Sequence, residues 1–95
     1  SKFAHDEELR FRCEARRNKL LGLWAADLLG KSGDEAQAYA KEVVAADFEE
    51  AGDEDVYRKV AGDFAAKNVD QSEHQIRREM GDLMAVAIDQ IRNEA

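Results

Sequence analysis

Apolar residues recur along most of this 95-residue chain at intervals of three or four, which is typical of helices buried on one side. The clearest stripe lies near the C-terminus, and its members are Ile76, Met80, Leu83, Met84, Ala87, Ile88 and Ile91. Similar stripes cover three earlier stretches. We therefore predict an all-α fold, a four-helix bundle in one domain (residues 1–95), with helices at about 4–29, 33–51, 54–67 and 73–93.

The residues between these stretches are ones that end and begin helices. Asn68 suits the left-handed conformation that closes a helix, and Gly52 is expected to end the second helix. Asp53 follows as an N-cap for the third helix. Ser32–Glu35 and Ser72–Gln75 have the spacing of capping boxes, in which each side chain bonds to the other residue's backbone amide. The sequence thus predicts three short connections.

Each predicted helix offers apolar side chains to one shared core. The expected members are Ala36, Tyr39, Ala40, Val43, Val44 and Phe48 in the second helix, Val56, Tyr57, Val60 and Phe64 in the third, and Leu20, Leu21, Leu23, Trp24, Leu28 and Leu29 late in the first. Methionine and aromatic residues at this spacing are typical of a core rather than of a cofactor site.

The first half of the first helix has a much thinner apolar stripe. Between residues 5 and 19 the apolar positions are Leu9, Phe11, Cys13 and Ala15. A half-helix of this kind buries little against its own bundle. We therefore predict that it is weakly packed, and that it projects or serves another protein.

The net charge of −7 is unevenly distributed. Residues 1–31 hold seven basic and five acidic side chains, whereas residues 32–66 hold three basic and ten acidic ones. An acidic chain argues against nucleic-acid binding, which needs a positive face. Cys13 is the single cysteine, so no internal disulfide can form. The longest strictly apolar run, Leu23–Ala26, is too short to span a membrane.

Residues 25–32 nearly match the phosphate-binding loop whose glycines, lysine and hydroxyl hold a triphosphate. Ala25 replaces the first glycine, and the residues before Gly30 have a helical pattern. We therefore interpret Gly30 as a helix end and Ser32 as a cap. An alternative remains, in which Lys31 and the free amides at the start of the second helix hold a phosphate.

Basic side chains form two faces of the first helix. Arg12, Arg16 and Lys19 share one face, and Arg10 and Arg17 share another. Such sets can bind phosphate or the acidic side chains of a partner. They can equally pair within the chain, with Glu14 or with the acidic second and third helices.

No arrangement typical of catalysis or metal binding is apparent in the sequence. His5 and His74 each lack a second histidine or cysteine at metal-ligand spacing. Neither lies beside a serine or the cysteine at the spacing of a nucleophilic motif. We expect neither a metal site nor catalytic residues, and therefore no enzyme.

Five blocks carry a family resemblance: Phe3–Phe11, Ala15–Ala26, Tyr39–Val44, Asp47–Val56 and His74–Arg78. With them, essentially the whole chain resembles the zeta subunit, the ATPase inhibitor protein of alphaproteobacterial F-type ATP synthases. The resemblance implies a four-helix bundle, monomeric when free, that regulates rather than catalyses. It also implies a bacterial protein of the cytoplasm, peripheral to the inner membrane through the synthase.

In that family an N-terminal segment inserts between the catalytic and rotor subunits of the synthase head and blocks ATP hydrolysis. By resemblance, residues 1–12 are the remnant of this segment. Its partner-binding residues are then Phe3, His5, Glu8, Leu9, Arg10, Phe11 and Arg12. The resemblance also implies ADP or ATP as a regulatory ligand, with no cofactor required. The residues we expect to contact a nucleotide are Arg16, Arg17, Lys19 and Trp24.

The chain departs from the family at its start. Family members carry further residues ahead of this block, whereas only Ser1 and Lys2 precede Phe3 here. We therefore expect most of the inhibitory segment to be missing, and this chain to bind poorly or not to inhibit at all. The alternative function is a small nucleotide-responsive helical binding module with a different protein partner.

Overall fold

The computed structural model describes residues 2–48 and 52–94, with side chains described from Asp6 onward. Within this part of the chain there are four α-helices and no strand. The helices are α1 (Lys2–Leu28), α2 (Gly33–Ala46), α3 (Glu54–Ala66) and α4 (Glu73–Glu94). The all-α four-helix bundle expected from the apolar stripes is confirmed.

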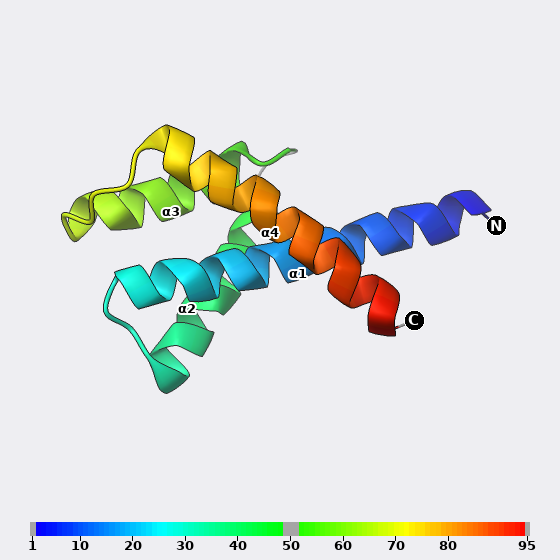
Figure 1. The fold of residues 1–95 in the computed structure, drawn as a ribbon, viewed down its shortest axis with the longest axis horizontal. Helices are drawn as coiled ribbons and strands as arrows, with labels where there is room; N and C mark the ends of the chain where they lie inside the picture. The colour runs from blue at the N-terminus through cyan, green and yellow to red at the C-terminus, as the bar shows by residue number, and fades with distance from the viewer. Residues whose placement is uncertain (1, 49–51, 95) are drawn as a thin grey trace.

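α1 is the axis on which the other helices pack. It runs along the long dimension of a molecule that measures 47 × 27 × 21 Å, and α4 crosses it (Figure 1). Its contacts with α2 and α4 are the most extensive in the bundle, and α3 contacts all three other helices. The N-terminal end of α1, drawn in blue, projects beyond the other helices at one end of the molecule (Figure 1).

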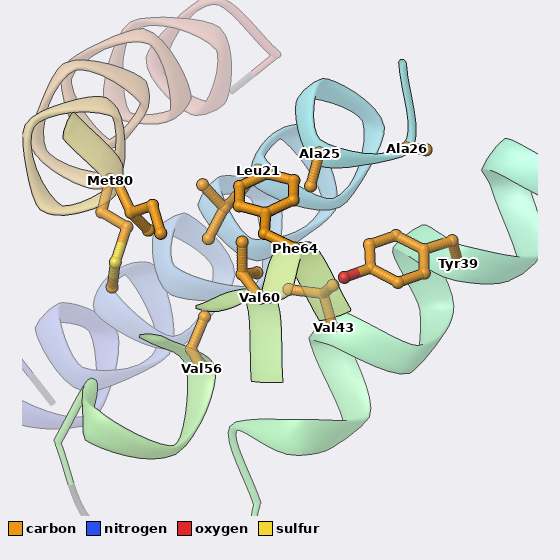
Figure 2. Close-up of a cluster of buried hydrophobic side chains, with 10 residues drawn as sticks. Leu21, Ala25, Ala26, Tyr39, Val43, Val56, Val60, Phe64 and Met80 are labelled. Carbon is orange, nitrogen blue, oxygen red and sulfur yellow. The ribbon is translucent and has the colours of Figure 1, made fainter. Parts of the chain in front are cut away.

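The core lies where the apolar stripes of the four helices meet (Figure 2). Its buried members are Leu21, Ala25, Ala26, Tyr39, Val43, Val56, Val60, Phe64, Ile76 and Met80. Trp24 packs edge-on against Phe64, with ring centroids 5.7 Å apart. Such aromatic contacts add to the stabilisation that burial itself provides.

Gly22 sets the distance between α1 and α2. A Cβ at this position would lie 2.6 Å from the Cα of Ala40, closer than real Cβ contacts come. The two backbones are therefore so close at this point that only the hydrogen side chain of glycine fits between them. The sequence did not reveal this role, because a glycine inside a helical pattern has no distinctive spacing of its own.

Most of the helix ends follow the expected residues. Asn68 has a φ of 56°, and Ser72 and Gln75 form the expected capping box at 2.8 and 3.1 Å. The box expected at Ser32–Glu35 is wrong, since the Ser32 side chain makes no capping bond. Gly33 follows with a φ of 55°, outside the right-handed geometry that a capping box needs in its first turn. The cap expected from Asp53 is also wrong, because its carboxylate makes no bond to the first turn of α3 and accepts from Arg17 instead.

The end of α2 is the main departure from the predicted fold. The helix ends at Ala46 rather than near residue 51, and residues 49–51 lie outside the described part. The amides of Asp47 and Phe48 bond to carbonyls three residues back, which tightens the last turn. Because of this tighter turn, the Phe48 side chain does not continue the buried apolar face of α2. Its expected core position is therefore wrong, and its side chain is 70% exposed.

The expected core position of Leu28 is also wrong. Its side chain is 38% exposed at the last residue of α1, where the chain leaves the bundle.

The weak packing predicted for the start of α1 is confirmed. Residues 6–8 are exposed, Leu9 is half-buried, and close packing begins only near residue 13. Further along the same half, however, Arg17 and Asn18 are almost completely buried. The thin apolar stripe gave no sign of these two buried polar side chains.

Candidate functional site

The projecting end of α1 carries the residues that the sequence assigned to partner binding. Glu8, Arg10, Phe11 and Arg12 are exposed on it, and Leu9 is half-buried. The side chains of Phe3 and His5, from the same set, lie outside the described ones. The structure therefore places five of the assigned residues on one helical segment, within reach of a second protein.

Phe11 contacts Phe48, and both are largely exposed. Their ring centroids are 6.4 Å apart, and the exposed fractions are 62% and 70%. The pair forms where the end of α2 comes against α1. Sequence periodicity missed this aromatic pair because it assigned Phe48 to the core.

The last turn of α4 holds α1 just after its projecting end. Glu94 forms ion pairs with Arg16 at 2.7 Å and with Arg12 at 3.8 Å. Arg16 also donates a hydrogen bond to Gln90 at 2.8 Å. Pairing within the chain is therefore present on this basic face, with α4 as the partner rather than α2 or α3. On the other face, Arg10 pairs with Glu14 at 4.0 Å, as the internal-pairing alternative predicted.

Arg17 lies on another face of α1, where its own side chain is buried while that of Asp53 stays half exposed. Its guanidinium donates to Asp53 at 2.8 Å and to the side-chain oxygen of Asn18 at 2.7 Å. Asp47 lies close by, and partial burial raises the pKa of its carboxyl, with Asp55 adding to the effect. Arg17 therefore ties α1 to the start of α3, as the internal-pairing alternative predicted.

The four residues expected to contact a nucleotide do not all lie together. Arg16 and Lys19 line one hollow of about 400 Å³, which Arg12 also lines. Arg17 points towards Asp53 instead, and Trp24 packs against the core. The structure thus brings two of the four together, and nucleotide binding stays a prediction.

The segment that resembles a phosphate-binding loop is the end of a helix. Residues 25–28 belong to α1, and both alanines at its start are fully buried. Gly30 has a φ of 79°, which suits a residue just past a helix end. The side-chain nitrogen of Lys31 lies 6.0 Å from the ring centre of Tyr39. The interpretation as a helix end is confirmed.

Comparison with known proteins gives one matching family model and one similar solved structure. A family model described as ATPase inhibitor subunit zeta matches residues 1–90. A protein with a solution NMR structure is 59% identical, with a TM-score of 0.81 over 92% of this chain and 99% of that chain. No curated protein matches the chain. None of the described helices is long and apolar enough to cross a membrane.

Proposed function

The chain belongs to the ATPase inhibitor subunit zeta family, and we propose that the projecting end of α1 carries out the inhibition. In this proposal the end enters the soluble head of an F-type ATP synthase, between its catalytic and rotor subunits, and stops hydrolysis. The family is one of regulatory subunits. The four-helix bundle then places the segment rather than taking part in the chemistry.

The observation that supports this proposal is the exposure of the projecting end. Residues 6–8 are exposed, although they belong to a continuous helix. A few helical turns gain little stability alone in water, so such a segment is best stabilised by a second surface. Leu9 and Phe11 offer apolar anchors, and Arg10 can steer the segment towards acidic surface.

An ATP hydrolysis assay on the isolated synthase head tests the proposal. The double variant Leu9→Ala, Phe11→Ala removes both anchors, and we expect about a tenfold higher half-inhibiting concentration, since few residues dominate most interfaces. The matched control is Leu28→Ala, Val86→Ala, which removes two exposed apolar side chains elsewhere. Circular dichroism confirms that both variants are folded. Equal inhibition by the two variants would contradict the proposal.

We also propose weak binding of ADP or ATP, with the phosphates held by Arg16 and Lys19. The supporting observation is the hollow that these side chains share with Arg12. The ion pair between Arg16 and Glu94 must open first, so we expect weak affinity, on the order of 0.1–1 mM. Amide signals of Arg16 and Lys19 should shift in an NMR titration with ADP. The alternative function gains support if ADP shifts these signals while the synthase head is not inhibited.

A further inference from the structure

A hollow of about 350 Å³ lies along the exposed side of α2, with Lys19 of α1 at its border. The other side chains that line it belong to α2 or to the turn just after it: Gln37, Ala40, Lys41, Val44, Ala45 and Phe48. From Gln37 to Ala45 it follows α2 for about 12 Å. None of its lining residues belongs to the segment that the sequence assigned to partner binding. It is therefore a separate surface feature, here called the α2 hollow.

The lining of the α2 hollow is mainly apolar. Ala40 is 1% exposed and lies at its bottom, where α2 comes close to Gly22 of α1. Val44 is half-buried, and the small side chains of Ala40 and Ala45 leave the space unfilled. Phe48 stands at one end and is largely exposed. A second apolar side chain that enters the hollow removes this surface from water, which favours its entry.

The charged side chains of the α2 hollow are both basic. Lys19 and Lys41 are exposed, and within residues 6–48 and 52–94 neither forms an ion pair. No acidic side chain among these residues lines the hollow, although the chain has a net charge of −7. In contrast, Lys59 of α3 pairs with Glu42 and Asp63. The two lysines of the hollow are therefore available to the carboxylates of another molecule.

The α2 hollow adjoins the projecting end of α1. Phe48, at one end of the hollow, contacts Phe11 of the projecting end, with ring centroids 6.4 Å apart. A protein that takes up the projecting end therefore comes within reach of the hollow as well. The partner ATPase of the proposed function is thus the molecule that lies nearest to the hollow in the inhibited complex.

We propose that the α2 hollow receives an apolar side chain, flanked by carboxylates, from the surface of the partner ATPase. The proposal rests on the proposed function, and it adds a second contact that the bundle itself makes. The apolar side chain covers Val44 and the Phe48 ring, while the carboxylates pair with Lys19 and Lys41. This contact holds the bundle beside the head, and so raises the local concentration of the projecting end at its own binding place.

The surroundings of the α2 hollow favour a local protein contact over a polyanion. α2 lies within residues 32–66, which hold three basic and ten acidic side chains. A nucleic acid or an anionic membrane extends beyond the two lysines and meets the repulsion of this acidic stretch. A protein surface can place carboxylates opposite the two lysines alone, with an apolar side chain between them.

Blocking the hollow tests the proposal. Ala45→Trp places a large ring at the edge of the hollow, whereas the control Ala65→Trp makes the same change at an exposed position of α3. Binding of each full chain to the isolated synthase head is measured by titration calorimetry. We expect about tenfold weaker binding for Ala45→Trp, and no more than about a twofold loss for Ala65→Trp, because few side chains dominate most interfaces. Circular dichroism confirms that both variants are folded.

Reversing one charge tests the carboxylates separately. Lys41→Glu should weaken binding about fivefold at low salt, and the loss should shrink as salt rises. The control Lys67→Glu reverses an exposed charge just after α3, changes the net charge equally, and should cost no more than about twofold. Phe48→Ala should weaken binding by a similar factor at every salt concentration, because its contact is apolar.

The remaining outcomes overturn the inference and separate it from the proposed function. If the unaltered chain inhibits hydrolysis and Ala45→Trp binds as Ala65→Trp does, the α2 hollow is not a contact, although the proposed function stands. If the unaltered chain neither binds nor inhibits, both fail. If Lys41→Glu binds the head as Lys67→Glu does, the carboxylates are absent from the occupant. If Lys41→Glu instead loses binding to phosphatidylglycerol vesicles, the occupant is a membrane surface.

Discussion

At the scale of single residues, two positions carry information that the apolar pattern does not contain. Gly22 decides how closely α1 and α2 approach, because any Cβ there meets the backbone of Ala40. Asp47 is a partly buried carboxylate at the point where α2 ends, and its titration is influenced by Asn18 of α1 and Asp55 of α3. Both depend on contacts between segments distant in sequence, which local spacing cannot predict.

Gly22→Ala should destabilise the protein by about 1–3 kcal/mol, because the added methyl group pushes the backbones of α1 and α2 apart. Gly81→Ala is the matched control, since a Cβ there meets nothing within 4 Å. It should stabilise the protein by up to about 1 kcal/mol through higher helix propensity. Urea unfolding followed by circular dichroism measures both changes. Stabilisation by both substitutions would show that the close approach has no energetic consequence.

Asp47→Asn should raise stability at neutral pH. Partial burial and the nearby Asp55 raise the pKa of the Asp47 carboxyl above its ordinary 3.8, so the folded state holds the proton more tightly than the unfolded state does. The free energy of unfolding therefore falls as the pH rises from 3.8 through the folded pKa. The gain from the substitution should accordingly disappear as the pH drops below 3.8. Urea unfolding across this range checks the trend, with Asp70→Asn as the control for loss of one charge. A gain independent of pH would contradict the burial argument.

At the scale of helices, the sequence predicts what local spacing determines. The start of α4 and the end of α3 at Asn68 follow from their capping residues as predicted. α3 begins at the expected Glu54, but without a capping bond from Asp53. The early end of α2 was not predicted, because an apolar stripe does not reveal where tightened backbone bonds take Phe48 out of register. The burial of Arg17 also escaped, since its acceptor Asp53 lies 36 positions away in the chain.

The ion pairs of Glu94 should slow local unfolding of α1 in the turns next to its projecting end. Glu94→Gln releases Arg12 and Arg16, so amide hydrogen exchange in residues 12–16 should become about two to five times faster. Residues 21–26, in the core, should keep their slow exchange. Asp89→Asn, an exposed carboxylate of α4, provides the control. Unchanged exchange in Glu94→Gln would show that α4 does not hold this part of α1.

At the scale of the whole molecule, two phenylalanines have different roles. One is part of the folded core, and the other is exposed and available to a partner. Phe64 is 1% exposed within the core, and Phe48 is 70% exposed just beyond the end of α2. The sequence assigned both to the core, since both fall on apolar stripes. The structure distinguishes them, because only Phe64 is enclosed by side chains of the other helices (Figure 2).

Phe64→Ala should cost about 3–5 kcal/mol of stability, which is a large share of what a domain of this size has. Phe48→Ala should cost less than about 1 kcal/mol, because most of the ring is already in water. Thermal unfolding followed by circular dichroism compares the two. Similar losses for both variants would mean that Phe48 belongs to the folded core.

The most direct test of the central claim is to ask which end of the molecule loses mobility when the synthase head is bound. After Cys13→Ser, a nitroxide label is attached to a cysteine introduced at Glu8, or, as the control, at Asp82 on α4. Both positions are exposed in the free protein. In the inhibited complex, the electron paramagnetic resonance spectrum should show strong immobilisation of the label at position 8 and little change at position 82. A label at position 8 that stays as mobile as in the free protein, while hydrolysis is inhibited, would contradict the claim that the projecting end of α1 is the inhibitor.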